Sequence, residues 1–353
     1  MNNIRFLIFC MVIIMVTYFL PDEPTGDKLK AQMPLGLDAT FKTVPSFYNR
    51  QDQDQYDFAI ATHVTVDQLE RLAWISDKWR APISAAIYVH NDTDVSKIVS
   101  LIRSSYSVTQ FVDVHLLYSN NTRYPVNSLR NLAVQNAESE WVLMMDVDYL
   151  PPIYLYQNLE SYAEKIPKDQ MTGIAMASFS SSLGRFDLPN DKSELIDLIS
   201  SRKINSKTKE CLKCHSATNY SRWYTEKDPY ETTYKWTYEP VLAIRKSQAV
   251  KFDERFKGIG YDIIGNTFAL AAKGFNYVVL PEAWVVHVKT VTTASATSTT
   301  LPKQQQKQQQ HSSPQIDLQQ RDSLKILCDS FSTARTKAGK DNTSLFGEPL
   351  HDA

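Results

Sequence analysis

Hydrophobic and polar positions in the first part of the chain follow a pattern of strands alternating with helices. Short apolar runs predict buried strands at residues 57–63, 83–89, 111–117 and 141–145. Apolar residues at helical spacing predict helices that end near residue 79 and that cover residues 94–106 and 126–137. This alternation predicts an α/β fold, with a mostly parallel, Rossmann-like sheet covered by helices on both faces.

The second part of the chain is less regular. Further strands are predicted at residues 171–179, 238–244 and 276–287, and a short helix at 193–200. Residues 201–236 form a polar insertion with scattered aromatic side chains. The Thr/Ser-rich and then Gln-rich residues 290–315 predict disorder, and residues 316–353 a terminal helix and tail. We therefore expect the folded domain to cover residues 56–289.

The N-terminus carries an apolar run from Ile4 to Leu20, with Arg5 on its N-terminal side. It predicts a membrane anchor at 6–20 after a cytoplasmic tail at 1–5, and the polar residues 21–55 predict a stem. No small residues precede Pro21, as a signal-peptidase site would require, so an uncleaved anchor is favoured over a cleaved signal peptide. The domain is then expected in the lumen of the secretory pathway.

Sequons of the type N-x-S/T agree with that topology and occur at Asn91, Asn120, Asn219 and Asn342. Such triplets also arise by chance, so they support a lumenal domain only in combination with the predicted anchor. An oxidising lumen bears in turn on the cysteines, because it allows disulfides to form and persist.

One cysteine, Cys10, lies in the apolar run, which leaves three for the predicted lumenal part. The motif Cys211-Leu212-Lys213-Cys214-His215 matches a haem-attachment pattern and half of a zinc site. No second C-x-x-C motif follows, and haem attachment is unexpected behind a signal anchor. We expect a disulfide instead, either within the motif or between one of its cysteines and Cys328.

The amino-acid composition excludes few classes of binding partner. The chain has 353 residues, of which 43% are hydrophobic and 22% charged, and this is enough for one large α/β domain or two smaller ones. The formal net charge of −1 offers no argument for nucleic acid, and no nucleic-acid partner is predicted. The aromatic content of 11% would suit stacking against carbohydrate.

The clearest candidate chemistry follows the apolar run Trp141–Met145, where Asp146-Val147-Asp148 precedes two prolines. Residues i and i+2 of a strand share a face, so the two carboxylates are expected to converge at the end of a buried strand. Two acidic groups held together require a cation or hydrogen bonds to compensate them. The pattern is typical of a D-x-D site, where a divalent metal bridges carboxylates and a nucleotide diphosphate.

Three further segments carry candidate site residues. Arg130, between Asn127 and Asn131 on a predicted helix, offers a donor fork for phosphate or, structurally, for the D-x-D carboxylates. Gly258 and Gly260 let backbone approach a ligand, and Asp262 is a candidate general base. His287 ends a predicted buried strand and becomes a candidate metal ligand if that strand lies beside Asp148. The ordinary alternatives are a turn at the glycines and a structural histidine.

Several linked motifs together resemble the LARGE-type and β-1,4-glucuronyltransferase-type enzymes of glycosyltransferase family 49. In chain order these motifs are Thr62-His63-Val64-Thr65, Tyr124-Pro125-Val126-Asn127, Arg130-Asn131, Asp146-Val147-Asp148-Tyr149-Leu150-Pro151, Tyr238-Glu239-Pro240, Phe252-Asp253-Glu254-Arg255-Phe256, Gly258-Ile259-Gly260 and Val286-His287. The resemblance covers residues 57–289.

The resemblance implies a GT-A fold and a single-pass type II Golgi membrane enzyme that uses a UDP-sugar and Mn²⁺. It implies Asp146, Asp148 and His287 as metal ligands. It also implies transfer to a glycan or glycoprotein hydroxyl with inversion, for which Asp262, or as second choice Glu239, is the expected base. A homo- or hetero-dimer stays open.

The chain departs from the family pattern at four places. Val288-Lys289-Thr290 stands where the family has a second His close to His287, and the Thr/Gln-rich segment before the last predicted helix is unusual. Tyr261-Asp262-Ile263 stands where the family tends to carry an aromatic residue, Asn and a basic residue, and Ser180 stands where an acidic residue is common. A basic residue after Gly260 could contact the carboxylate of a uronic acid, and Tyr261-Asp262-Ile263 contains no basic residue. Glucuronic acid is therefore expected as the donor sugar from the resemblance alone. The alternative is a catalytically inactive lumenal protein that binds glycans or a partner.

Overall fold

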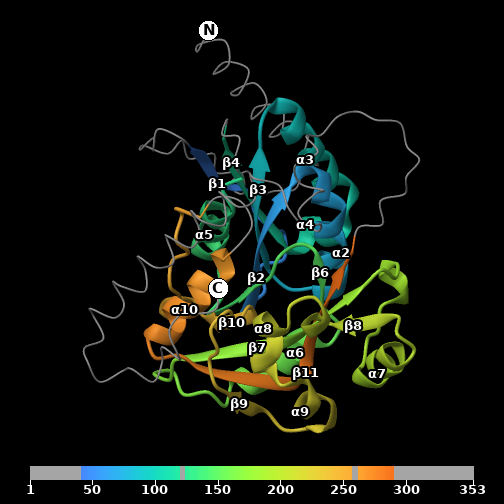
Figure 1. Cartoon of the computed structure of the whole chain (residues 1–353). Coiled ribbons are helices and arrows are strands. Elements are labelled where there is room, and N and C mark those ends of the chain that lie inside the picture. The colour runs from blue at the N-terminus through green and yellow to red at the C-terminus, as the bar shows by residue number, and fades with distance from the viewer. Residues whose placement is uncertain (1–40, 120–123, 257–260, 290–353) are drawn as a thin grey trace, which may run out of the picture.

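An 11-stranded mixed sheet forms the centre of the part that the computed structural model describes, which is residues 41–119, 124–256 and 261–289 (Figure 1). The strand order is β1-β4-β3-β2-β5-β10-β7-β11-β6, with β8 paired to β7 and β9 to β11. The predicted α/β class is therefore confirmed.

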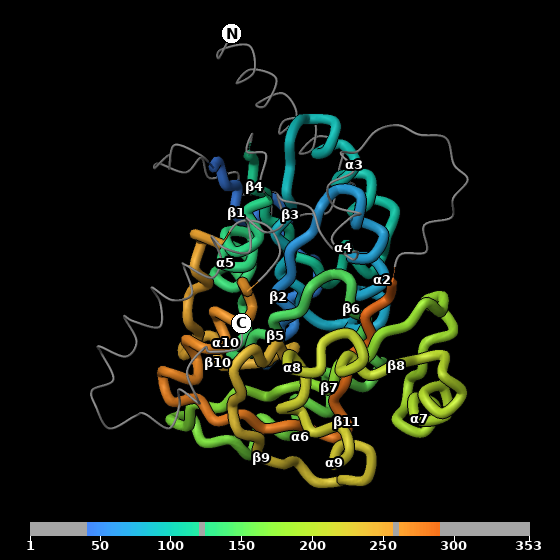
Figure 2. The backbone as a smooth tube through the Cα atoms, in the orientation of Figure 1, coloured from blue at the N-terminus to red at the C-terminus, as the bar shows by residue number. Residues whose placement is uncertain are grey.

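The first half of the sheet is parallel. It consists of β2 (Phe58–Thr65), β3 (Ile83–Val89), β4 (Val112–Tyr118) and β5 (Trp141–Met144). Helices α2 (Leu69–Trp79), α3 (Asp92–Ser104) and α4 (Tyr106–Phe111) lie on one side of these strands, and α5 (Val126–Asn136) on the other (Figure 2). Every side chain of β3 is buried, as expected for a strand covered on both faces. The predicted elements are confirmed to within a few residues, but α4 was not predicted.

The second half joins the first through antiparallel pairing. Strand β10 (Val241–Arg245) runs antiparallel to β5 on one side and to β7 (Thr172–Ser181) on the other. Strand β11 (Asn276–Val288) is parallel to β7, and the short β6 (Tyr149–Leu150) pairs antiparallel with β11. This last pairing places the segment after the D-x-D motif next to the end of β11.

The insertion at residues 201–236 is folded. It contains β8 (Ile204–Ser206), α8 (Leu212–His215), α9 (Tyr220–Thr225) and β9 (Tyr230–Thr232), and it lies over the lower half of the sheet (Figure 1). The remaining helices are α6 (Leu155–Ala163), α7 (Lys192–Ser200) and α10 (Asp262–Ala272). Trp223 of α9 is fully buried against Phe179 of β7, with ring centroids 5.1 Å apart. The insertion therefore contributes to the main core.

The predicted stem is wrong for its last part, because residues 42–48 form strand β1 of the sheet. Strand β1 (Lys42–Tyr48) pairs antiparallel with β4 at the edge, with a register irregularity between Val44 and Tyr48. Pro45 is tolerated in such an edge strand. Arg50 is also buried, and its Nη1 lies 2.5 Å from Oδ2 of Asp113. The domain thus begins before residue 56.

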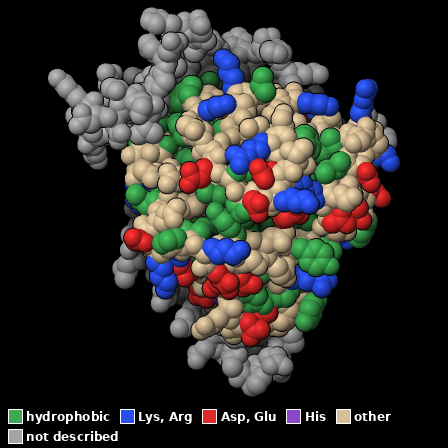
Figure 3. Space-filling model, turned by 90° about the horizontal axis from the view of Figure 1, so that it is seen from below, with side chains coloured by type: hydrophobic (Ala, Val, Ile, Leu, Met, Phe, Trp, Pro, Cys, Tyr) green, Lys and Arg blue, Asp and Glu red, His purple; other side chains and the backbone are tan. Residues whose placement is uncertain are grey.

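Other predictions fall outside the described residues: the tail and anchor at 1–20, the stem at 21–40, and residues 290–353. Among the helices that the structure describes, none combines the length and apolar character needed to cross a membrane. On the face seen from below, acidic and basic side chains are interspersed with hydrophobic ones, and neither sign of charge covers that face (Figure 3).

Candidate active site

Asp146 lies two residues after the end of β5, and the side chains of Arg130 and His63 contact its carboxylate. Nη2 of Arg130 lies 3.1 Å from Oδ1 and 3.2 Å from Oδ2, and Nε2 of His63 lies 3.0 Å from Oδ1. His63 is at the end of β2, the parallel neighbour of β5, so both strands deliver their side chains to the same sheet edge. Burial alone would raise the pKa of Asp146, but Arg130 and His63 outweigh it and hold that pKa below its usual range.

Asp148 lies two residues after Asp146 and makes a different set of contacts. Nη1 of Arg71 lies 3.1 Å from its Oδ1, and its backbone carbonyl accepts a hydrogen bond of 2.9 Å from the amide of Val288. Burial raises the pKa of Asp148, and the charge of Arg71 opposes that rise. The backbone bond to Val288 places Asp148 beside the end of β11, as the metal-site prediction required.

His287 pairs in register with Tyr149 of β6, and the two rings meet edge to face with centroids 5.2 Å apart. Its Nδ1 is buried and has no hydrogen-bond partner within the described residues. Burial lowers the pKa of His287 to about 4, so the imidazole is neutral at pH 7. A neutral imidazole with an unpaired nitrogen is the form that binds metal.

The residues fit a divalent cation in part. A carboxylate at Asp148 and an imidazole at His287 are ligands that Mn²⁺ accepts. Asp146, the third predicted ligand, is already paired with Arg130 and His63. Within the described ranges, no group of three or more His, Cys, Asp or Glu side chains is arranged to hold a metal ion by itself.

Asp262, the first-choice base, begins α10 and is buried against Arg130, whose Nη1 donates a hydrogen bond to Oδ2 of Asp262. Arg130 therefore bridges Asp146 and Asp262. Of the two roles expected for this arginine, the structure contains the ion pair with a D-x-D carboxylate. Asp262 does not line the pocket beside the D-x-D motif.

Asn127 and Asn131, the candidate site residues on either side of Arg130, make hydrogen bonds to the backbone before α10. Asn127 donates a hydrogen bond of 2.8 Å to the carbonyl of Asp253. Asn131 donates a bond of 2.9 Å to the carbonyl of Phe252 and accepts one of 2.8 Å from its amide. Both amides thus attach α5 to the segment before α10, and neither lines the pocket. Gly258 and Gly260 lie outside the described residues.

A pocket of about 200 Å³ lies beside Asp146. Its polar lining includes Arg130, Asp146, Lys207, Glu210 and Glu239, which come from α5, the segment after β5, the insertion and the segment before β10. Burial, then the charge of Asp262, raise the pKa of Glu239 to about 7. A carboxylate with that pKa, in a pocket with the D-x-D motif, is suited to take a proton near neutral pH.

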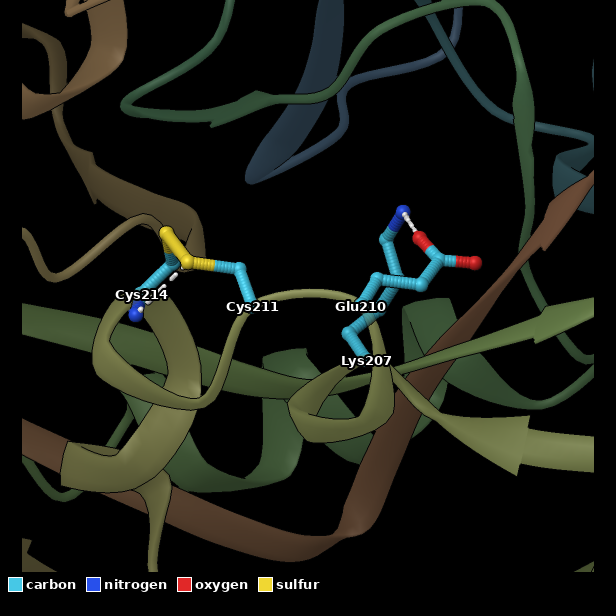
Figure 4. The surroundings of a disulfide bond; sticks show 4 residues. All are labelled: Lys207, Glu210, Cys211 and Cys214. Carbon is cyan, nitrogen blue, oxygen red and sulfur yellow. Dashed lines mark hydrogen bonds and ion pairs between the residues drawn. A yellow bond between two sulfur atoms is a disulfide. The ribbon is translucent and has the colours of Figure 1, made fainter. Parts of the chain in front are cut away.

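The insertion forms one wall of this pocket through a loop closed by a disulfide between Cys211 and Cys214 (Figure 4). Of the two expectations for these cysteines, the local disulfide is confirmed. Lys207 and Glu210 lie on the turn just before this loop and point toward each other, with Nζ of Lys207 2.5 Å from Oε2 of Glu210. The backbone amide of Glu239 donates a hydrogen bond of 2.9 Å to the carbonyl of Cys214, so the loop also contacts the candidate base.

Sequence reasoning did not select His63, Arg71, Lys207 or Glu210 as site residues. His63 had a usable signal, because it ends a predicted parallel strand next to the D-x-D strand. Arg71 lies on a predicted helix, and its contact with Asp148 depends on how α2 packs. Lys207 and Glu210 lie in an insertion without periodicity, where the sequence carries no signal beyond the neighbouring C-x-x-C motif.

Comparisons with known proteins agree with the resemblance. The family model described as "Glycosyl-transferase for dystroglycan" matches residues 57–123 and 118–321. "Glycosyltransferase-like protein gnt14" of Dictyostelium discoideum is 39% identical over 85% of this chain and 46% of that protein. "Xylosyl- and glucuronyltransferase LARGE2" of Mus musculus is 29% identical over 66% of this chain and 34% of that protein. This chain thus spans less than half the length of both relatives.

Among solved structures, GalNAc-T7 with UDP, GalNAc and Mn²⁺ matches with a TM-score of 0.43 and 12% identity, over 68% of this chain and 45% of that one. The match to the family model covers well over half of the chain. The protein therefore belongs to the family 49 glycosyltransferases, related to LARGE2 and to the Dictyostelium gnt proteins.

Proposed function

We propose that this glycosyltransferase is a GT-A-type, metal-dependent, inverting enzyme that moves a sugar from a UDP-sugar to a hydroxyl of a glycan acceptor. The observation that carries the proposal is the placement of Glu239 and Asp146 in one pocket at the end of β5. This arrangement supplies a proton acceptor next to a D-x-D motif, and inversion by a single in-line displacement needs one such base.

Glu239 is the base that the geometry favours over Asp262. Glu239 lines the pocket, and its pKa of about 7 matches the working range of a general base. Asp262 is buried and bound to Arg130, so protonating it would break an ion pair within the protein. We assign to Asp262 and Arg130 the positioning of Asp146.

A divalent cation, Mn²⁺ by family resemblance, would be held by Asp148 and His287 together with phosphate oxygens of the nucleotide. When bound, it would stabilise the charge of the UDP leaving group. The unpaired, buried Nδ1 of His287 and its neighbour Asp148 support this assignment. Such sites commonly use one or two protein ligands and complete the shell with substrate phosphates.

The donor sugar is proposed to be glucuronic acid, by the resemblance to glucuronyltransferases. The name of the mouse relative, xylosyl- and glucuronyltransferase, also makes xylose a candidate. We further propose that the protein is a single-pass type II membrane protein of the Golgi, with its domain in the lumen. The apolar run at residues 4–20 and the disulfide between Cys211 and Cys214 support a secretory location.

The test is release of UDP from a panel of UDP-sugars by the purified full-length chain with Mn²⁺. Turnover of one donor is expected, and it should be lost on chelation of the metal and in Asp148→Asn. Asp169→Asn, at an exposed position, is the matched control and should keep full activity. Binding of a UDP-sugar without turnover of any donor would contradict the proposal and favour the inactive, glycan-binding alternative.

A further inference from the structure

Lys207 is a cation held inside the pocket by the insertion. Its side chain is only 12% exposed, and its Nζ lies 6.0 Å from the ring centroid of Tyr149, next to the D-x-D motif. Arg130 also lines the pocket, but its guanidinium is bound to Asp146 and Asp262. Lys207 therefore supplies the pocket with a positive charge that the D-x-D carboxylates do not pair.

The partner of Lys207 is a carboxylate that it shares with a second lysine. Oε2 of Glu210 lies 2.5 Å from Nζ of Lys207, and its Oε1 lies 2.7 Å from Nζ of Lys289. Burial raises the pKa of Glu210, but the hydrogen bonds from the two lysines outweigh it and lower the pKa to about 2. Two ammonium groups thus face one ionised carboxylate, and the cluster keeps one net positive charge.

The loop that carries this cluster is held in place by several bonds. The amides of Glu210 and Cys211 donate hydrogen bonds of 2.9 and 3.0 Å to the carbonyl of Lys207. Cys211 in turn forms the disulfide with Cys214. An ammonium group has three N–H donors, and in the described part of the chain Glu210 is the one acceptor recorded for Lys207. The remaining donors can bind a ligand without a change in the loop.

We propose that Lys207 binds an oxyanion of the donor substrate, in competition with the carboxylate of Glu210 that pairs with it in the unliganded pocket. The inference rests on the proposed function, because it takes the ligand to be a UDP-sugar. Two oxyanions of such a donor have suitable chemistry: the diphosphate, which every UDP-sugar carries, and the carboxylate of a uronic acid.

Binding of UDP, UDP-glucose and UDP-glucuronate to the full-length chain, measured by calorimetry, tests the inference. Lys207→Gln should weaken binding about 10- to 100-fold, the range for a charge-assisted hydrogen bond. Loss toward all three ligands assigns Lys207 to the diphosphate, and loss toward UDP-glucuronate alone assigns it to the carboxylate. Lys209→Gln, an exposed lysine of the same turn bonded to Asn205, is the control and should bind like the unaltered chain.

Glu210→Gln separates anion binding from a structural ion pair. If Lys207 binds an anion, removal of the neighbouring negative charge should tighten binding severalfold, opposite in sign to Lys207→Gln. Equal weakening by both variants, or a Lys207→Gln variant that binds like Lys209→Gln, would overturn the inference. Thermal unfolding of each variant reports whether the variant folds. Lys207→Arg keeps the positive charge and should bind the nucleotides with an affinity within a few-fold of that of the unaltered chain. If the unaltered chain binds none of the three nucleotides, the proposed function itself fails.

Discussion

The backbone amide of Glu239 donates a hydrogen bond of 2.9 Å to the carbonyl of Cys214, and this bond connects the candidate base to a disulfide-closed loop. The amide belongs to the residue that precedes Pro240 and strand β10, and the carbonyl belongs to α8 of the insertion. One short segment, residues 207–215, thus carries Lys207 and Glu210 on the pocket wall and also holds the backbone of Glu239, the proposed base.

The double variant Cys211→Ser/Cys214→Ser should lower both stability and turnover. The disulfide closes a very short loop, and the chain-entropy relation gives about 2 kcal/mol for its contribution to the free energy of unfolding. Turnover should fall further than stability explains, because the loop positions Glu239. Urea unfolding and steady-state kinetics of the oxidised and reduced protein measure the two effects. Unchanged turnover after full reduction would argue against the positioning role.

Replacing Glu239 by Gln should lower kcat by about 100- to 10,000-fold, the usual contribution of a general base. KM for the donor should change little, because the amide keeps the size of the side chain. Asp262→Asn is the informative comparison: it loses a partner of Arg130, so its main effect should be on stability. If Asp262→Asn loses activity at full stability while Glu239→Gln stays active, the two roles must be exchanged.

Activity should rise with pH through about 7. Burial and the charge of Asp262 raise the pKa of Glu239 from 4.5 to about 7, and only the ionised carboxylate accepts a proton. A carboxyl with a raised pKa in the folded state stabilises the fold below its unfolded pKa, near 4.5, and this contribution is lost as the pH rises through 7. The free energy of unfolding, relative to Glu239→Gln, should therefore fall over that interval. Profiles of kcat/KM and of urea unfolding against pH check both statements.

Arg130→Met should reduce the free energy of unfolding by about 3 kcal/mol, because it leaves the buried carboxylate of Asp262 without its cation. The double variant Arg130→Met/Asp262→Asn should recover part of that loss. Arg222→Met removes an exposed pair with Glu226, which water and salt screen, and should cost far less stability. Equal losses for the two arginines in urea unfolding would show that the bridge between Asp146 and Asp262 adds no stability.

The periodic part of the chain could be predicted well, because apolar spacing decides which backbone is buried. Strand β3 has the predicted bounds, Ile83–Val89. The polar edge strand β1 was missed, since an edge strand with a proline lacks the apolar run of a buried strand. The insertion was recognised as irregular, but the packing of Trp223 on Phe179 depends on a long-range contact without a local pattern.

The sequence by itself determined the family, the D-x-D motif at the end of a buried strand and the candidate ligand at the end of β11. Those features depend on local order, and strand periodicity decides which side chains share a face. Only the tertiary structure decided that Arg130 joins Asp146 to Asp262, that Glu239 rather than Asp262 lines the pocket, and that Lys207 completes its wall. These relationships depend on how separate segments pack against each other, and burial and neighbouring charge, which set each group's chemistry, exist only after that packing.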